Sequence, residues 1–346
     1  MIRNQRPGVY SRYDAASSYT APMSLRYAAV VAKATGGETD RLYSFASLAE
    51  ALEIFPYSAD ETYVMSDLIG LLFESGVSRV LAVAVGNGYE TAFETLSAAE
   101  NVGAVICDAH EQEDLTKLRS YVLKSFEERR ECIAFCGIGD AAAAAAAAEA
   151  LNCERMVIAS PNASLRRNGR RSAVFATAAL AGRILATGDA AYNFNGEAFT
   201  QLNEPEILQE NIIQQLLESG VTVFESVGGE VECIRALTTR TKTNGVPERS
   251  LSGINTVLII DDIMQFVRQT LRIQLRGGRV SGSPLESIRS QVVVALSQKQ
   301  QEGLIESFAP PRCRADLTDP GVCIVEMSFT VAHVISQIHV TAHIQV

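Results

Sequence analysis

Short apolar segments alternate with helix-like segments between residues 22 and 200, and this alternation restricts the fold more than any other feature of the sequence. The apolar segments are continuous rather than alternating, which is typical of strands buried on both faces of a parallel sheet. The helix-like segments between them are long enough to serve as crossover connections. We therefore expect a doubly wound, mostly parallel α/β sheet with helices on both faces. Four of its expected strands are SRVLAVAV (78–85), VGAVICD (102–108), ECIAFC (131–136) and RMVIAS (155–160).

The pattern changes after residue 200. A helix is expected over 204–220, followed by strands at 221–227 and 230–239 that the glycine pair Gly228–Gly229 joins as a hairpin. Two further helices are expected at 261–276 and 284–302, followed by closing strands. We therefore divide the chain into an α/β body (22–200) and a C-terminal α+β domain (201–330), between an N-terminal extended arm (1–21) and a C-terminal exchange strand (331–346).

Both ends of the sequence carry strand-like segments. Residues 337–346, QIHVTAHIQV, alternate strictly between polar and apolar side chains, which is typical of a half-buried strand. Residues 1–20 are mostly polar, with a strand-like stretch only at 8–10. We predict that each arm adds to the sheet edge of a different copy of the protein. The residues expected in these contacts are Pro7, Gly8, Val9, Tyr10, Ile338, Val340, Ala342, Ile344 and Val346.

Charge and apolar content exclude several functional classes. The net charge of −10 argues against direct nucleic-acid binding, which needs a basic face. No apolar stretch reaches transmembrane length, so no membrane insertion is expected. Residues 1–18 lack the apolar core of a signal peptide, and the seven cysteines form no CxxC pair. We expect reduced thiols and a protein that stays in the cytoplasm unless it leaves by lysis.

Candidate chemistry is sparse, and each candidate has a structural alternative. The turn Gly137–Asp140 could hold phosphate at a helix N-terminus, or Asp140 could simply cap that helix. The pair Asp261–Asp262 could be catalytic, or it could open a helix where carboxylates suit the dipole. No GxSxG, HExxH or P-loop motif is present, so no catalytic residue and no cofactor are expected.

Three of the four histidines lie in the tail, at 333, 339 and 343. His339 and His343 share one strand face, but at strand rise they are roughly 13 Å apart, too far for one metal ion. Cross-strand packing is the alternative, with a pH effect on assembly left open. We therefore expect no metal site.

One local basic stripe stands out in this acidic chain. Arg268, Arg272 and Arg276 are spaced four residues apart and line one helical face. The stripe is either a solvated face near a helix C-terminus or a docking face for an acidic partner.

The order of several blocks resembles the contractile tail sheath proteins of phages and phage-tail-like bacteriocins, over nearly the whole chain. The most specific block is residues 216–241, in which a glycine, a strand, a turn and a second strand lead into Arg-x-Leu-Thr-Thr. The other resembling blocks are RPGVY (6–10), LLFESGVSRVLAVAV (71–85), EALNCERMVIASPN (149–162), ATAALAGRILATG (176–188) and the closing strands (322–346).

The resemblance implies a structural rather than an enzymatic function. Copies would polymerise as stacked six-fold rings around a tail tube and contract on a baseplate signal, driving the tube through a target cell envelope. The partners implied are other copies of the chain, the tail tube protein, and the baseplate and tail terminator proteins. Because the C-terminal domain of such sheaths contacts the tube, the resemblance assigns Arg268, Arg272 and Arg276 to tube docking.

Two other functions remain open at this stage. A soluble nucleotide- or cofactor-binding α/β enzyme would need a ligand at Gly137–Asp140. A non-contractile tubular shell protein would polymerise into one fixed lattice.

Overall fold

The computed structural model describes residues 26–272, 282–319 and 321–332. The N-terminal arm (1–21), residues 333–346 of the predicted exchange strand, Arg276 and the three tail histidines lie outside the described residues. Val331, assigned to the exchange strand, is instead the last residue of the closing strand Cys323–Val331. The helices are α1 (Leu48–Ile54), α2 (Met65–Glu74), α3 (Tyr89–Leu96), α4 (Gln112–Glu127), α5 (Ala141–Leu151), α6 (Ala173–Thr187), α7 (Glu210–Glu218), α8 (Ile254–Arg272) and α9 (Gly282–Gln301).

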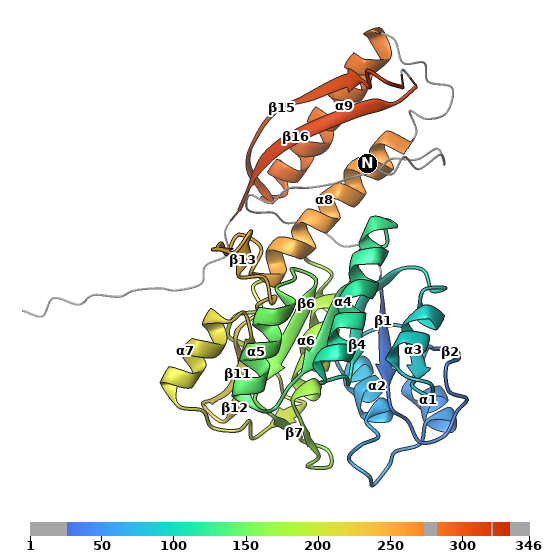
Figure 1. Ribbon diagram of the computed structural model, residues 1–346, viewed down its shortest axis with the longest axis vertical. Coiled ribbons are helices and arrows are strands. Elements are labelled where there is room, and N and C mark those ends of the chain that lie inside the picture. The colour runs from blue at the N-terminus through green and yellow to red at the C-terminus, as the bar shows by residue number, and fades with distance from the viewer. Residues whose placement is uncertain (1–25, 273–281, 320, 333–346) are drawn as a thin grey trace, which may run out of the picture.

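Nine strands form one large sheet in the order β2-β3-β1-β4-β5-β6-β11-β12-β9 (Figure 1). The inner strands β3, β1, β4, β5, β6 and β11 run parallel, while β2, β12 and β9 pair antiparallel at the two ends. The prediction of a large, mostly parallel sheet with crossover helices is confirmed. These strands are β1 (Tyr27–Ala32), β2 (Leu42–Phe45), β3 (Val80–Ala84), β4 (Val102–Cys107), β5 (Ile133–Gly137), β6 (Met156–Ser160), β9 (Glu197–Ala198), β11 (Thr222–Val227) and β12 (Glu230–Arg235).

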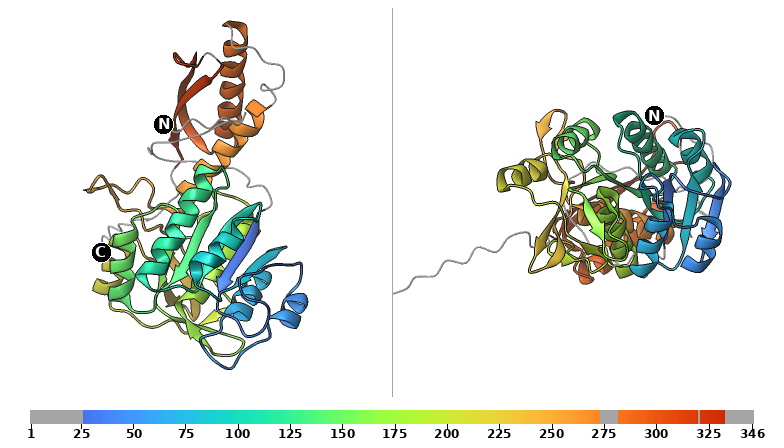
Figure 2. Two further views of the ribbon diagram at one scale, coloured as in Figure 1. Left: turned by 45° about the vertical axis from the view of Figure 1, so that its right-hand side comes forward. Right: turned by 90° about the horizontal axis from the view of Figure 1, so that it is seen from below.

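The sheet is buried on both faces, which explains why its strands are continuously apolar. Ala28 and Val30 of β1 face a core completed by α1, α2, α6 and the first turns of α8. Ala29 and Val31 face the opposite core, completed by α3, α4, α5 and α7. Helices are seen on both sides of the sheet when the molecule is viewed from below (Figure 2).

Local sequence signals set several element ends as predicted. Ser47 caps α1 by accepting a hydrogen bond from the Glu50 N–H, and the Glu50 carboxylate accepts one from the Ala46 N–H. Gly228 and Gly229 both have positive φ and form the predicted turn between β11 and β12.

Two predicted boundaries are corrected. The helix expected from residue 204 begins only at Glu210, because Glu204 has a φ of 42° and precedes Pro205, where helical backbone is disfavoured. The boundary expected at residue 200 falls inside the large sheet, since β11 pairs with β6 and β12 pairs with β11. The sheet therefore continues to Arg235.

The remaining elements build a C-terminal unit. Helix α8 starts against the sheet body and runs away from it toward α9 and a two-stranded hairpin, β15 (Ile305–Ala315) and β16 (Cys323–Val331) (Figure 1). Two small sheets complete the fold, formed by β7 (Ala163–Leu165), β8 (Arg171–Ser172) and β10 (Leu202–Asn203), and by β13 (Lys242–Thr243) and β14 (Val246–Pro247).

Candidate functional site

The α8 junction is the set of charged residues that joins α8 to the sheet body and to α9: Glu131, Arg155, Asp261, Asp262, Arg268 and Lys299. Glu131 and Arg155 lie just before β5 and β6, so they mark the amino ends of two parallel strands. Helix α8 crosses these ends, and the α8 junction forms where side chains from distant parts of the chain meet.

The central pair of the junction is Arg155 with Asp261. The two terminal guanidinium nitrogens of Arg155 donate to the two carboxylate oxygens of Asp261 at 2.8 and 2.6 Å. The side chains are 0% and 2% exposed. The Arg155 guanidinium also stacks on the ring of Phe126 at 4.0 Å. This two-pronged, fully desolvated contact fixes the orientation of α8 more specifically than apolar packing would.

Asp262 and Lys299 form the second pair, which joins α8 to α9. Lys299 Nζ lies 3.1 Å from Asp262 Oδ2 and 3.1 Å from a carboxylate oxygen of Glu302, and 4.3 Å from the Phe266 ring centroid. Burial raises the pKa of Asp262, and the Lys299 ammonium opposes that shift. The expectation that Asp261 and Asp262 open a helix was therefore wrong: α8 begins seven residues earlier, at Ile254, and both side chains are buried mid-helix.

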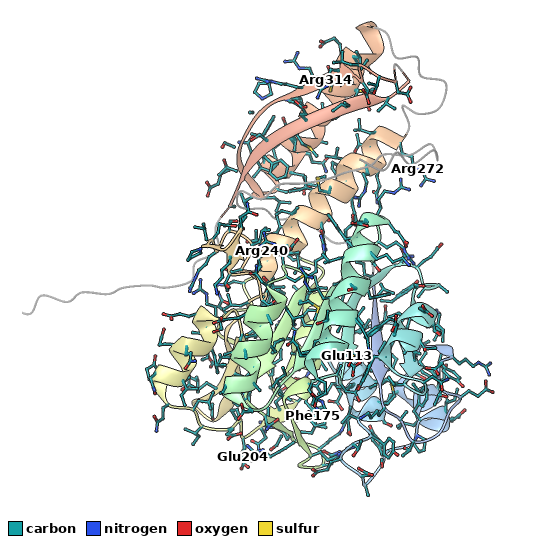
Figure 3. All side chains as sticks on the ribbon, in the orientation of Figure 1. Glu113, Phe175, Glu204, Arg240, Arg272 and Arg314 are labelled. Carbon is teal, nitrogen blue, oxygen red and sulfur yellow. The ribbon has the colours of Figure 1, made fainter. Side chains whose placement is uncertain are left out.

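Arg268, the first residue of the predicted basic stripe, has an intramolecular partner. Its guanidinium donates to Glu131, whose side chain is fully buried, and the Arg268 side chain itself is 11% exposed. Arg26 donates to the Glu131 carbonyl at 2.8 Å and Gln265 to its carboxylate at 3.1 Å. Only Arg272 of the stripe is exposed on the described surface, at the end of α8 (Figure 3). Arg268 and Arg272 therefore differ in their environment: Arg268 is bound to Glu131, and Arg272 is exposed.

The β15–β16 hairpin offers a second candidate feature. Phe308 of β15 lies opposite Phe329 of β16, and both pack toward the core together with Val325 and Met327. Within the described residues this sheet has two strands, so the outer edge of β15 has no strand partner there. Such an edge can accept a further strand through backbone hydrogen bonds.

The Arg-x-Leu-Thr-Thr block, whose role the sequence did not reveal, anchors the chain beyond β12. Thr239 Oγ1 donates to the Cys153 carbonyl and accepts from the Cys153 N–H, both at 3.0 Å. Thr238 Oγ1 donates to the Leu251 carbonyl at 2.7 Å, and both threonines are fully buried. The motif therefore ties the segment before α8 to the start of β6.

The glycine turn Gly137–Asp140 is occupied by protein atoms. A Cβ at Gly137 would lie 2.1 Å from the backbone nitrogen of Val174, and one at Gly139 would lie 2.2 Å from the side chain of Asn162. The Asp140 carboxylate accepts from the Ala143 N–H at 2.8 Å and caps α5. Close packing accounts for the glycines, and the capping alternative is confirmed.

Two kinds of site are absent from the part of the chain that the structure describes. No three His, Cys, Asp or Glu side chains converge there as a possible metal site. None of the helices in the described ranges is long and apolar enough to cross a membrane.

Comparison with known proteins gives a clear answer at the level of fold. No protein-family model and no curated protein match the sequence. Solved structures do match. The helical sheath of the anti-feeding prophage in its contracted state has a TM-score of 0.72 and 12% identity, with 99% of each chain covered. A chain of the six-fold symmetrised baseplate of the same prophage has a TM-score of 0.73 and 12% identity, with 99% of this chain and 100% of that chain covered.

A separately solved sheath tail protein agrees with this assignment. The protein from Desulfitobacterium hafniense has a TM-score of 0.68 and 10% identity, with 94% of this chain and 100% of that chain covered. The chain therefore has the fold of tail sheath proteins, as the order of its sequence blocks predicts.

Proposed function

We propose that this chain is the structural subunit of a contractile tail sheath, which polymerises in six-fold rings around a tail tube and shortens to drive the tube through a target cell envelope. The observation that carries the proposal is the end-to-end match to the contracted helical sheath of the anti-feeding prophage. A match over 99% of both chains leaves no large part of the fold unaccounted for. The subunit has no enzymatic role in this proposal.

Strand exchange supplies the connection between subunits. The open edge of β15 can accept an extended segment, and the alternating segment 337–346 and the stretch Pro7–Tyr10 are candidate donors from other copies. Each backbone hydrogen bond between chains contributes about 1 kcal/mol net. Several such bonds, with one buried apolar face, would keep subunits linked while their bodies change position.

The C-terminal unit is our candidate for the tube-facing part. Arg272 is exposed at the end of α8, and Arg276 follows four residues later in the sequence. An exposed arginine side chain such as Arg272 would form weak, salt-sensitive contacts with an acidic tube, which suits a sheath that must release the tube. Arg268 contributes to this surface only indirectly, by fixing α8 against Glu131.

The remaining partners follow from the same assembly. A sheath subunit would meet the baseplate at one end of the tail and a terminator protein at the other. We propose that it assembles in the cytoplasm of the producing cell and leaves as part of a phage tail or tail-like particle. No direct contact with nucleic acid and no membrane insertion are part of this function.

Negative-stain microscopy of the expressed protein tests the proposal. We expect tubes from the full chain and only small species after deletion of residues 337–346, with unchanged circular dichroism of the body. Tubes that keep one length and width after acid or denaturant treatment would instead indicate a non-contractile shell. A monomer that forms no polymer at any concentration, with or without an added tail tube protein, would refute the proposal.

A further inference from the structure

A groove on the C-terminal unit lies between α9 and the bulged middle of β15. It has a volume of about 470 Å³ and is lined by Glu286, Arg289, Ala309, Pro310, Pro311, Arg312 and Cys313. The lining combines apolar side chains, an alanine and two prolines, with charged ones, and Arg289 and Arg312 outnumber the one carboxylate, Glu286, which lies 3.7 Å from Arg289. The groove is thus a mixed polar and apolar surface with a net positive charge.

The two prolines protect this groove from the strand exchange proposed for the same edge. The register of β15 with β16 shifts between Ala309 and Arg312, so Pro310 and Pro311 sit in a bulge. Proline has no N–H to donate, so an added strand cannot continue its hydrogen-bond ladder through this point. The groove stays available even when an arm pairs with the rest of β15.

The tip of the same hairpin has the complementary character. Leu317 is 93% exposed, and two carboxylates flank it at Asp316 and Asp319. In the described part of the turn, Thr318 N–H and Oγ1 each donate to Asp316 at 2.9 Å, and the Val322 N–H donates to the Asp319 carbonyl at 2.9 Å. The tip is a preorganised apolar knob with a negative rim.

The tip cannot fill the groove of its own chain. Cys313 is the lining residue nearest to Leu317 in the sequence, and the separation of four residues spans roughly 13 Å at strand rise. The same tip on another copy of the chain has the charge and the apolar side chain that this groove would accept. Two surfaces that differ and complement each other make a head-to-tail contact, which propagates from copy to copy instead of closing as a dimer.

We propose that the hairpin tip around Leu317 docks into the α9–β15 groove of a neighbouring copy in the polymer, with Arg312 facing the acidic rim of the tip. This contact rests on the proposed sheath function, since it needs a polymer. It adds a side-chain contact that is distinct from the exchange of backbone strands. A single contact of this kind, one apolar side chain between charges, would bind weakly. Its contribution would add up because the contact repeats along the polymer.

Cysteine crosslinking tests the contact, because native Cys313 lines the groove. In polymers of a Leu317→Cys variant, mild oxidation should produce a ladder of covalent multimers on a non-reducing gel. Adding Cys313→Ser to that variant should remove the ladder without removing the polymers. Ile207→Cys is the matched control, since Ile207 is 95% exposed on the sheet body and should give no ladder that depends on Cys313.

Neutralising the charge of Arg312 tests the same contact by an independent measurement, the protein concentration needed for assembly. Arg312→Gln should raise the protein concentration needed for assembly by about fivefold, the effect of losing one rim ion pair. Arg314→Gln on the same strand should change it less, because Arg314 pairs with Glu326 within the chain.

The outcomes separate this inference from the proposed function. Polymers of Leu317→Cys without a Cys313-dependent ladder would overturn the tip contact and leave the sheath function standing, and would indicate that another segment covers the groove. Equal effects of Arg312→Gln and Arg314→Gln would also count against it. Failure of the unaltered chain to polymerise would overturn both.

Discussion

Replacing Asp261 by asparagine should destabilise the protein far more than neutralising one partner of a surface ion pair. The substitution keeps the shape of the side chain but removes the carboxylate charge that the Arg155 guanidinium, 0% exposed, contacts at 2.8 and 2.6 Å. Removing one partner of a buried pair costs about 3–5 kcal/mol, because the remaining charge stays desolvated. The exposed pair Arg314–Glu326, with side chains 53% and 51% exposed, is the matched control. Glu326→Gln should cost no more than about 1 kcal/mol.

Urea unfolding of the monomeric, assembly-deficient chain lacking residues 337–346 provides the assay, with circular dichroism as the readout. A third variant separates charge burial from lost packing: Arg155→Met combined with Asp261→Leu removes both charges and should recover most of the stability. The reasoning would be wrong if Asp261→Asn and Glu326→Gln lowered the free energy of unfolding equally. It would also fail if the double variant were as unstable as Asp261→Asn alone, since packing would then explain the loss.

Three further predictions address other parts of the fold. Gly137→Ala should cost about 3 kcal/mol or more in urea unfolding, because its Cβ would meet backbone atoms, whereas Gly169→Ala, with open space but a φ of 72°, should cost about 1 kcal/mol. The pKa of Asp262 is raised in the native state, so between the usual pKa of 3.8 and the raised one the native state holds a proton that the unfolded state has lost. The contribution of Asp262 to the free energy of unfolding therefore falls as the pH rises above 3.8. Asp262→Asn should remove this pH dependence from the midpoints of urea unfolding. Thiol labelling of the native protein should modify Cys313 and Cys323 first, since the other five cysteines are buried, and simultaneous reaction of all seven would contradict the structure.

The sheet was predictable because its signal is local and repeated. Each buried strand is a continuous apolar run, and some of the helices begin at a side-chain cap that the sequence shows, such as Ser47 or Asp140. The α8 junction was not predictable, because its partners are far apart in the sequence: 106 residues separate Arg155 from Asp261. Helical spacing placed Arg268 on one face with Arg272, but spacing along one helix cannot reveal that Glu131, on another element, neutralises Arg268.

The Arg-x-Leu-Thr-Thr block shows a different limit of sequence reasoning. Thr238 and Thr239 looked like the end of a strand, yet β12 ends at Arg235 and both threonines hold irregular backbone through their hydroxyl groups. The pattern of residue types marked the block as typical of the resembling family but did not predict its hydrogen-bond partners. Its function became clear only when Cys153 and Leu251, from other segments, were seen as its hydrogen-bond partners.

The α8 junction also bears on where the proposed sheath would move. Ion pairs connect α8 to the sheet body through Arg155 and to α9 through Lys299, and so join the C-terminal unit to the body. We expect these buried pairs to favour one relative orientation of the two parts. Motion between subunits should then occur in the exchanged arms, with each subunit moving as a rigid body.

Spin labels placed on the two units would test this rigidity. Ile207→Cys and Leu317→Cys introduce exposed labelling sites on the body and on the hairpin, in a chain whose Cys313 and Cys323 are replaced by serine. The distance between the labels within one subunit, diluted among unlabelled copies, should change by less than one helical turn, about 5 Å, when the polymer is triggered. A larger change would place the hinge at the α8 junction itself, and the buried ion pairs would then have to exchange partners during contraction.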